Sequence, residues 1–203
     1  MGNYCGPKVR LSRALGVPIA ETPKHMRLRR ESPPGMHVLR RGRRKSLYGQ
    51  QLMEKQKLAR YYNVRDGQLR RYMEEATRAK RTTPLVLHEI LETRLDNVVR
   101  RLGWARTIWQ ARQMVSHAHF KVDGVKCNIP SFRCKPGMTL TVKPKSQKFV
   151  KEMSETAEFH LNLDWLERDD TKFEAKIVRM PSLEDSRIPF DIDYNKIVEF
   201  YSR

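Results

Sequence analysis

Apolar residues between positions 87 and 102 recur at the three- and four-residue spacing of an amphipathic helix. They are Leu87, Leu91, Leu95, Val98 and Leu102. Gly103 supplies the permissive residue expected just past the end of such a helix. A second face carries Arg94, Asn97 and Arg101, so we expect this face to present a row of hydrogen-bond donors to a partner. The alternative is an ordinary basic face that is solvated by water.

A second helix is expected to begin after Thr107, whose hydroxyl can cap it, with Gln110 three residues further on. Its inward positions are Ile108, Ala111, Val115 and Ala118. Its outward positions are Arg112, Gln113, Ser116 and His117. Guanidinium, amide, hydroxyl and imidazole groups suit phosphate and ribose oxygens. Asp96 and Asp123, the two carboxylates nearby, are explained locally by an arginine contact and a turn.

The pattern then changes to that of strands. Asp123-Gly124 between two valines is typical of a tight β-hairpin, and Lys135-Pro136-Gly137 predicts a further turn. Alternation predicts a strand through Met138, Leu140 and Val142. After an intervening helix, it also predicts antiparallel strands beside the hairpin, with apolar positions Phe159, Leu161, Leu163 and Trp165, and then Phe173, Ala175 and Ile177.

Two further helices are expected before position 83. Ser46 is expected to cap the first, with apolar positions Tyr48, Leu52, Leu58, Ala59 and Tyr62, and with Lys55, Lys57 and Arg60 outside. Asp66 is expected to cap the second, with Leu69, Tyr72, Met73 and Ala76 inward and Arg70, Arg71 and Arg78 outward. Thr83-Pro84 then opens the helix that runs to position 102.

The net charge of the chain indicates that it binds a charged partner. The 203 residues carry a formal net charge of +18 and a pI near 10.2, which favours a polyanionic partner. Residues 1–82 hold 21 basic and 6 acidic side chains, residues 83–150 hold 12 and 4, and residues 151–203 hold 8 and 13. The anion-binding surface should therefore lie in the first three-quarters of the chain. The mean hydropathy of −0.70 and the short apolar runs argue against a membrane span.

The first 45 residues mix proline and glycine with dense arginine, which predicts a basic extended arm. Its densest cluster is Arg40, Arg41, Arg43, Arg44 and Lys45. We expect this cluster to lie along a phosphate backbone, although a targeting-like or solubilising run has the same composition. The first residues match neither a signal peptide nor a myristoylation motif.

Neither a metal centre nor a disulfide framework is expected. Cys5, Cys127 and Cys134 are widely spaced and form no Cys-x-x-Cys pair, so we expect reduced thiols. His117 and His119 are the closest histidine pair, but the sequence places no further ligands beside them. No cofactor is expected.

The run RLDNVVRRLGWARTIWQARQMVSHAHFKVDGVKCNIPSF closely resembles the RNA-binding module named after small-subunit ribosomal protein S-four. Pseudouridine synthases, tyrosyl-tRNA synthetases and small stress-related RNA binders also carry that module. Three other segments resemble the S-four family itself: GPKVRLSRALG, YGQQLMEKQKLARYYNVRDGQLRRYMEEA and DIDYNKIVEFYSR. This chain departs from family members that bind zinc, because Val9 and Ser12 stand where two of their cysteines lie.

The resemblance implies an α+β fold in which a helical domain carries an inserted RNA-binding module. That module has two short helices packed on a small antiparallel β-sheet. The expected parts are an arm over residues 1–45, a helical domain over 46–86 completed by 186–203, and an inserted domain over 87–185 containing the module at 94–142. It also implies a protein of the small ribosomal subunit, in a bacterium or an organelle, that is not an enzyme.

By the same resemblance, the chain binds a multi-helix junction in the five-prime domain of small-subunit ribosomal RNA, early in assembly. It contributes to translational accuracy near the messenger RNA path and contacts ribosomal protein S-five, which suits the acidic last quarter. The alternatives are an RNA-modifying enzyme that bears the module and a general DNA-binding protein.

The residues expected to bind RNA come from the arm, the first helix and the module. They are Lys8, Arg10, Arg13, Arg40, Arg41, Arg43, Arg44, Lys45, Gln51, Lys55, Lys57, Arg94, Asn97, Arg101, Thr107, Arg112, Gln113, Ser116 and His117. From the row on the first module helix, we expect Arg101→Glu to lower RNA affinity far more than a change at Glu92.

Overall fold

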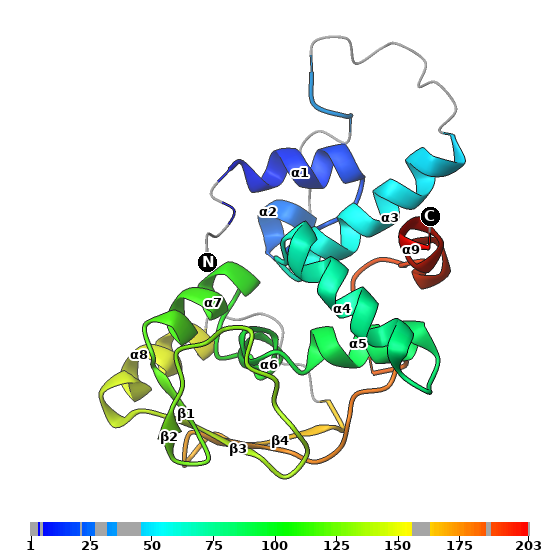
Figure 1. The fold of residues 1–203 in the computed structure, drawn as a ribbon. Helices are drawn as coiled ribbons and strands as arrows, with labels where there is room; N and C mark the ends of the chain where they lie inside the picture. The colour runs from blue at the N-terminus through cyan, green and yellow to red at the C-terminus, as the bar shows by residue number, and fades with distance from the viewer. Residues whose placement is uncertain are drawn as a thin grey trace. The chain divides into compact units, whose positions relative to one another are not determined.

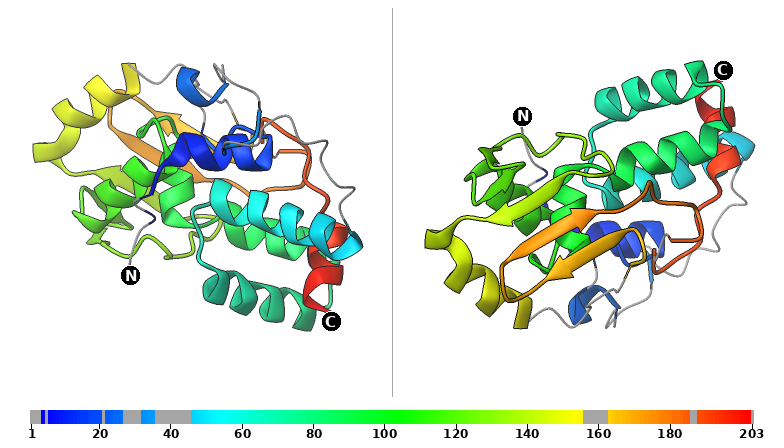
Figure 2. Two further views of the ribbon diagram at one scale, coloured as in Figure 1. Left: turned by 90° about the horizontal axis from the view of Figure 1, so that it is seen from above. Right: turned by 90° about the horizontal axis from the view of Figure 1, so that it is seen from below.

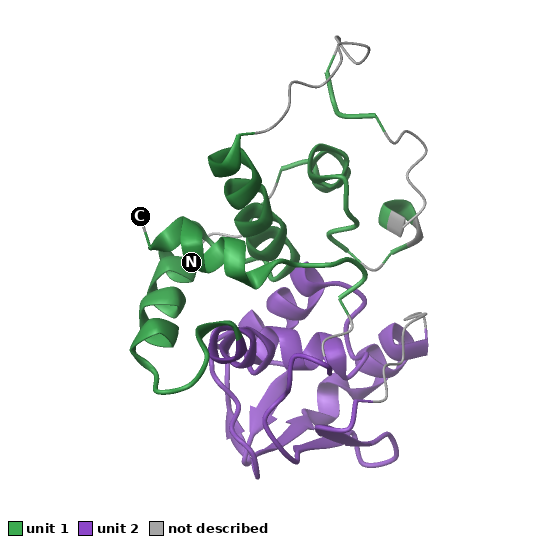
Figure 3. Ribbon diagram, turned by 90° about the vertical axis from the view of Figure 1, so that its right-hand side faces the viewer, with its two compact units in different colours: residues 1–84, 188–203 green, residues 85–187 purple. Residues whose placement is uncertain are grey.

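The computed structural model describes residue 4 and residues 6–20, 22–26, 32–35, 46–155, 163–185 and 188–202. The chain divides into two compact units (Figure 3). Unit 1 comprises residues 1–84 and 188–203, and unit 2 comprises residues 85–187. Unit 2 is thus formed by one continuous stretch of chain, whereas unit 1 needs both ends.

Unit 1 is helical. Its helices are α1 (Lys8–Leu15), α2 (Pro23–Met26), α3 (Leu47–Tyr61), α4 (Asp66–Arg78) and α9 (Tyr194–Tyr201). The prediction that Ser46 caps α3 is confirmed, since its hydroxyl accepts a hydrogen bond of 3.2 Å from the Gly49 amide. The inward positions predicted for α4, Leu69, Tyr72, Met73 and Ala76, are all buried. The expectation that Asp66 caps α4 is wrong, because Asp66 is the first residue of the helix and Arg65 holds the N-cap position without a side-chain hydrogen bond.

The C-terminal helix α9 packs against α3 and α4 (Figure 1). Ile197 is fully buried there, and the rings of Tyr48 and Phe200 lie with their centroids 5.7 Å apart. The Asp193 carboxylate caps α9 by accepting a hydrogen bond from the Lys196 amide. Residues near the end of the chain therefore complete a core that residues 47–78 begin.

The expectation of an extended arm is wrong for residues 8–15, which form helix α1. The helix ends at Gly16, whose φ of 70° suits a residue without a side chain. Ser12 is fully buried and holds the following segment through its hydroxyl, which bonds His25 Nδ1 at 2.7 Å and accepts from the Ile19 amide. Periodicity did not reveal this helix, because one of its two buried positions is the polar Ser12 and no side chain caps its start. The cluster from Arg40 to Lys45 lies outside the described residues.

Unit 2 contains a five-stranded antiparallel sheet in the order β2-β1-β3-β5-β4. The strands are β1 (Phe120–Val122), β2 (Val125–Lys126), β3 (Thr139–Val142), β4 (Leu166–Asp169) and β5 (Glu174–Ile177). The predicted hairpin is confirmed, since Asp123 and Gly124 have φ values of 47° and 78°, as a two-residue turn requires. The predicted strand through Ala175 and Ile177 is present as β5. The other predicted strand is misplaced, because β4 begins only at Leu166, and the buried Leu163 and Trp165 lie just before it. Phe159 and Leu161 lie outside the described residues.

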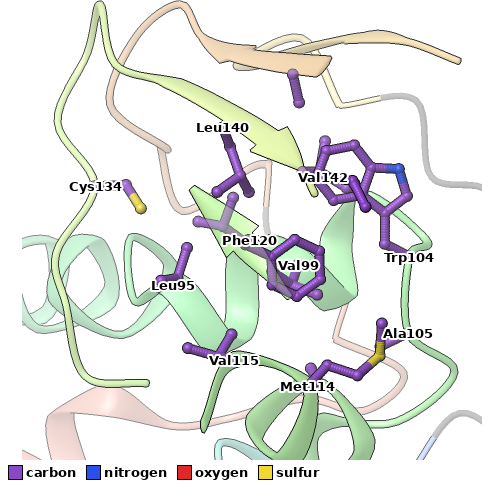
Figure 4. Close-up of a cluster of buried hydrophobic side chains, with 14 of the residues drawn as sticks. Leu95, Val99, Trp104, Ala105, Met114, Val115, Phe120, Cys134, Leu140 and Val142 are labelled. Carbon is purple, nitrogen blue, oxygen red and sulfur yellow. The ribbon is translucent and has the colours of Figure 1, made fainter. Parts of the chain in front are cut away.

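Helices α6 (Leu95–Arg101) and α7 (Ile108–Ser116) lie behind the sheet in Figure 2, right, and pack on one of its faces. Figure 4 shows the core between them, where Trp104 and Phe120 stack with ring centroids 5.7 Å apart. Helix α8 (Pro144–Glu155) adds Val150 to the same core. The opposite sheet face carries polar side chains such as Lys121 and Thr141. The α+β class is confirmed.

The single helix expected from Leu87 to Leu102 is instead two helices, α5 (Thr83–Glu92) and α6, separated at Thr93 and Arg94. The five apolar positions are all buried, but the backbone between the helices bonds to a distant segment. The Thr93 carbonyl accepts from the Cys134 amide at 2.8 Å, and the Leu95 amide donates to the Phe132 carbonyl at 2.8 Å. Contacts with residues 130–134 therefore break the helix. No helix among the described residues is long and apolar enough to cross a membrane.

Candidate nucleic-acid interface

Helix α7 presents the polar face that the sequence predicts. Thr107 caps it, accepting a 3.3 Å hydrogen bond from the Gln110 amide, while Gln110 Oε1 accepts one from the Arg106 amide. Ile108, Ala111, Val115 and Ala118 are buried as predicted. Gln113, Ser116 and His117 are exposed. The cap fixes where α7 begins and so which side chains face outward.

Arg94 does not face outward. Its guanidinium is 2% exposed and forms a bidentate pair with the fully buried Asp96 carboxylate, at 3.0 and 2.5 Å. Arg112 Nη1 approaches the same carboxylate at 3.5 Å, while its side chain stays 12% exposed. Asp96 therefore links α6 to α7, and the expectation that Arg94 offers donors to a partner is wrong.

Arg101 and Asn97 are likewise buried, which corrects the rest of the expected row. Glu92 accepts from Arg101 Nε at 2.9 Å, from Arg101 Nη2 at 2.6 Å and from Asn97 Nδ2 at 2.6 Å. Because α6 starts anew after Thr93, these side chains turn back toward the end of α5. The nearby His88 is also buried; its desolvation lowers the pKa of the imidazole, and the Glu92 charge opposes that effect.

Residues expected on the outside of α3 are largely engaged within unit 1. Gln51 is 1% exposed and donates from Nε2 to Glu199 Oε2 at 2.8 Å. Lys57 pairs with Glu54 at 2.7 Å. Lys55 pairs with Asp66 at 2.5 Å, and this contact lowers the pKa of the Asp66 carboxyl. The expectation of an open basic face on α3 is therefore wrong for these three side chains.

Helix α1 places its three candidates differently. Arg10 is exposed and Lys8 is half-buried. Arg13 donates from Nε to the Ser32 carbonyl at 3.0 Å and from Nη2 to the Pro33 carbonyl at 3.3 Å. Arg13 thus ties residues 32 and 33 to the helix, which leaves Arg10 as the candidate most open to a partner.

Three lysines that sequence reasoning missed come together at the β1–β2 hairpin. Lys121 and Lys126 are cross-strand partners, and Lys143 follows β3, where its amide donates to the His119 carbonyl. Partial desolvation, followed by repulsion from Lys126 and Lys121, lowers the pKa of the Lys143 ammonium. Alternation in β1 could have indicated an outward Lys121, but the convergence of the three lysines depends on strand register.

These side chains define what we call the α7–hairpin surface. It comprises Arg106, Arg112, Gln113, Ser116 and His117 on or beside α7, and Lys121 with its neighbours Lys126 and Lys143 on the sheet face opposite to α7. The two groups meet at His119, which lies near both His117 and Lys143. Residues 106–148 contain nine basic residues and one acidic residue, Asp123. The Asp123 carboxylate accepts a 2.8 Å hydrogen bond from the Thr139 amide and so serves the turn. Such a surface can bind phosphate groups through several cations at once.

In the described part of the chain, no set of three or more histidine, cysteine, aspartate and glutamate side chains is arranged to hold a metal ion. Cys127 and Cys134 are free thiols, and burial raises the pKa of Cys134 to about 12, which keeps this thiol protonated and unreactive.

The fold and this surface define an RNA-binding-module protein, and comparison with known proteins agrees. Residues 93–140 match the S4 domain family, and residues 3–92 match the family described as the ribosomal protein S4/S9 N-terminal domain. The chain is similar to the small ribosomal subunit protein uS4 of Aquifex aeolicus, with 43% identity over 211 aligned positions, and to that of Akkermansia muciniphila, with 44% over 206. Each alignment covers both chains completely.

A third relative, the uS4 protein of Geobacillus stearothermophilus, is 43% identical over 205 positions, again across the full length of both chains. Full-length similarity at this level shows common descent along the whole chain. The chain therefore belongs to the uS4 family of small ribosomal subunit proteins, which confirms the resemblance found in its sequence.

Proposed function

We propose that this chain is a structural constituent of the small ribosomal subunit that binds ribosomal RNA through the α7–hairpin surface. The observation that carries the proposal is the ratio of nine basic residues to one acidic residue over positions 106–148, most of which lie in the S4 domain match. A polyanion placed on this surface meets cations, amides and hydroxyls with hardly a carboxylate to repel it.

The buried charges contribute by holding that surface in shape. Asp96 binds Arg94 and approaches Arg112, so α6 and α7 are joined beneath the exposed residues of α7. A fixed surface loses little side-chain entropy when RNA binds. Specificity then comes from the shape of the RNA, because side chains cannot read the deep and narrow major groove of A-form helices.

In finer detail, the chain clamps a multi-helix junction in the five-prime domain of small-subunit ribosomal RNA and nucleates assembly there. Exposed cations of unit 1, such as Arg10 and Arg70, add phosphate contacts. The acidic residues 151–203 contact a basic neighbour, ribosomal protein S-five, and the bound chain lies near the messenger RNA path. The chain acts by binding and contributes to accuracy without performing a reaction.

Salt-dependent RNA binding tests this function. The full chain is titrated into a labelled transcript of the five-prime domain of a bacterial small-subunit ribosomal RNA, between about 50 and 500 mM salt. Each neutralised phosphate is expected to add roughly 0.7 to 0.9 to the slope of log affinity against log salt, so several contacts give a steep slope. A slope near zero contradicts the proposal.

A matched pair of variants locates the surface. Gln113→Glu with Ser116→Glu places two negative charges on the exposed face of α7 and should weaken binding at least about tenfold, since each charge repels nearby phosphates. The control is Lys172→Glu with Lys176→Glu, which changes the net charge twice as much but at the β4–β5 end of the sheet. A loss in the control that equals or exceeds the loss in the α7 variant would show that only net charge matters. Equal binding of duplex DNA and the transcript in a competition assay would favour a general DNA-binding protein. Modified nucleotides in the incubated transcript would favour an RNA-modifying enzyme.

A further inference from the structure

Three rings from separate segments meet at the edge of the α7–hairpin surface. His117 lies just after α7, His119 just before β1 and Phe149 in α8. The ring centroids of His117 and His119 are 6.1 Å apart, and those of His119 and Phe149 are 5.8 Å apart. The hydroxyl of Ser146 bonds His119 Nδ1 at 2.8 Å, which fixes the middle ring against α8.

Phe149 is exposed although the core of unit 2 is close by. Its side chain keeps 40% of its surface accessible, while Val150, the next residue, is fully buried. Lys145 precedes Phe149 by four residues, one helical turn, so this exposed ammonium lies on the same helix face as the ring. Lys148 is an exposed neighbour in sequence, and Glu152, three residues after Phe149, adds one carboxylate to the same face. The lysines outnumber this carboxylate, so the ring suits a flat, negatively charged partner.

The charge around the rings is positive, and the surroundings favour a neutral middle ring. Burial lowers the pKa of His119, and the neighbouring His117 and Lys143 lower it further, which favours the uncharged imidazole. Lys143 in turn lies near Lys126 and Lys121 of the hairpin. His119 therefore offers a ring face for stacking, and the lysines supply the charge.

We propose that Phe149, His119 and His117 form a stacking platform for an unpaired nucleotide of the bound RNA, whose phosphates are held by Lys143, Lys145 and Lys148. The proposal rests on the RNA-binding function above and extends the surface beyond the S4 domain match, which ends at residue 140. Unpaired bases stack on aromatic side chains while cations follow the backbone. An acidic protein segment would use the lysines but would gain little from the rings.

Tryptophan fluorescence tests stacking directly. The variant Phe149→Trp places an indole at the position of the Phe149 ring in the platform. Adding the five-prime-domain transcript should quench the emission of this indole, because a base stacks against it. The control is Leu183→Trp, since Leu183 is 41% exposed in the same unit but lies away from the lysines in sequence. Its emission should change little beyond that of the native tryptophans.

Affinity provides the second measurement. Phe149→Leu keeps an apolar side chain but removes the ring and should weaken RNA binding about fivefold or more. Leu183→Ala should leave RNA binding unchanged.

The outcomes separate the two proposals. If the unaltered chain binds the transcript with a steep salt slope while Phe149→Trp is not quenched and Phe149→Leu binds as before, the platform is wrong and the ribosomal function stands. If polyglutamate quenches Phe149→Trp and the transcript does not, the patch binds protein, which also overturns the platform. If the unaltered chain does not bind the transcript, both proposals fail.

Discussion

Helices α6 and α7 look alike in sequence and are used in opposite ways. Each has an apolar stripe beside a row of polar side chains that includes arginine. In α6 the row is buried, with Arg94 and Arg101 both 2% exposed, whereas in α7 Gln113 and Ser116 are exposed. The same pattern of residues thus serves folding in one helix and recognition in the next.

The position of carboxylates explains the difference. Asp96 and Glu92 lie close in sequence to the polar row of α6, and each accepts more than one hydrogen bond from it. No acidic residue occurs between Asp96 and Asp123, so the outward groups of α7 have no carboxylate of their own segment to turn toward. A nearby acid therefore predicts which arginine will be internal.

The largest loss of stability is expected from substitutions at the buried pair of Glu92 and Arg101. Glu92→Ala leaves the Arg101 guanidinium buried without its carboxylate, and Arg101→Met leaves the Glu92 charge uncompensated, so each should cost about 3 to 5 kcal/mol. Urea unfolding followed by tryptophan fluorescence measures the loss in unit 2, which contains all three tryptophans. Glu92→Leu with Arg101→Met should recover most of the stability.

This reverses the expectation from sequence that Arg101 matters to RNA far more than Glu92. Both substitutions are now expected to lower RNA affinity together, as a consequence of lost structure. A cost below about 1 kcal/mol for Glu92→Ala would show that the buried pair contributes little.

The second prediction concerns how pH changes the stability of the buried region around Glu92 and Arg101. His88 is buried near Glu92 and Arg101, and its folded pKa lies below its unfolded value. Its contribution to stability is therefore complete above the unfolded pKa, roughly 6.5, and is lost as the pH falls below it, by up to about 1.4 kcal/mol per pH unit. Unfolding of unit 2 measured between about pH 7 and 5 should show this loss.

The control for this prediction is His88→Gln, which keeps a side-chain donor but cannot be protonated. Its stability should vary less with pH over the same range. His119, whose pKa is also lowered, accounts for part of the remaining slope. Identical slopes in the two proteins would exclude His88 as the sensor.

A smaller loss of stability is expected at Thr107, and it shows whether this residue caps α7 or contacts RNA. Thr107→Ala removes the acceptor of the Gln110 amide and should destabilise unit 2 by about 1 kcal/mol, whereas Thr107→Ser keeps the oxygen and the stability. The same unfolding assay measures both. If Thr107→Ser binds RNA as tightly as the unaltered chain and Thr107→Ala loses stability, Thr107 acts through the helix start.

The smallest change in stability is expected on the exposed side of the comparison. Lys121→Gln with Lys126→Gln should alter the free energy of unfolding by no more than about 0.5 kcal/mol, because neither lysine is buried. The salt slope of RNA binding should nevertheless fall by roughly 0.7 to 0.9 for each lysine that touches a phosphate. An unchanged slope would remove the hairpin from the interface.

Local signals predicted most of the fold. The turn at Asp123-Gly124 and the caps at Ser46 and Thr107 depend on residues within four positions of each other, and each is present. The break at Thr93 could not be predicted in this way, because its backbone partners, Phe132 and Cys134, lie some forty residues later. The same limit hid the network around Ser12 that orders α1.

The candidate site was predicted less well than the fold. Sequence alone indicated the exposed residues of α7, since the helix period fixes its faces. It did not indicate that the α6 row is internal, because that depends on how Glu92 and Asp96 fold back. Nor did it find Lys126 and Lys143 beside Lys121, since their proximity follows from the pairing of three strands.

The packing of α9 against α3 and α4 bears on how the protein is made. Residues 85–187 emerge as one stretch and can fold once they have left the translating ribosome. Unit 1 cannot be completed until residues 194–201 appear, more than a hundred residues after α4. At a synthesis rate of about 5 to 20 residues per second, this delay lasts roughly 6 to 23 s. During this time α9 is not yet available to pack on α3 and α4, so their apolar faces are accessible to chaperones.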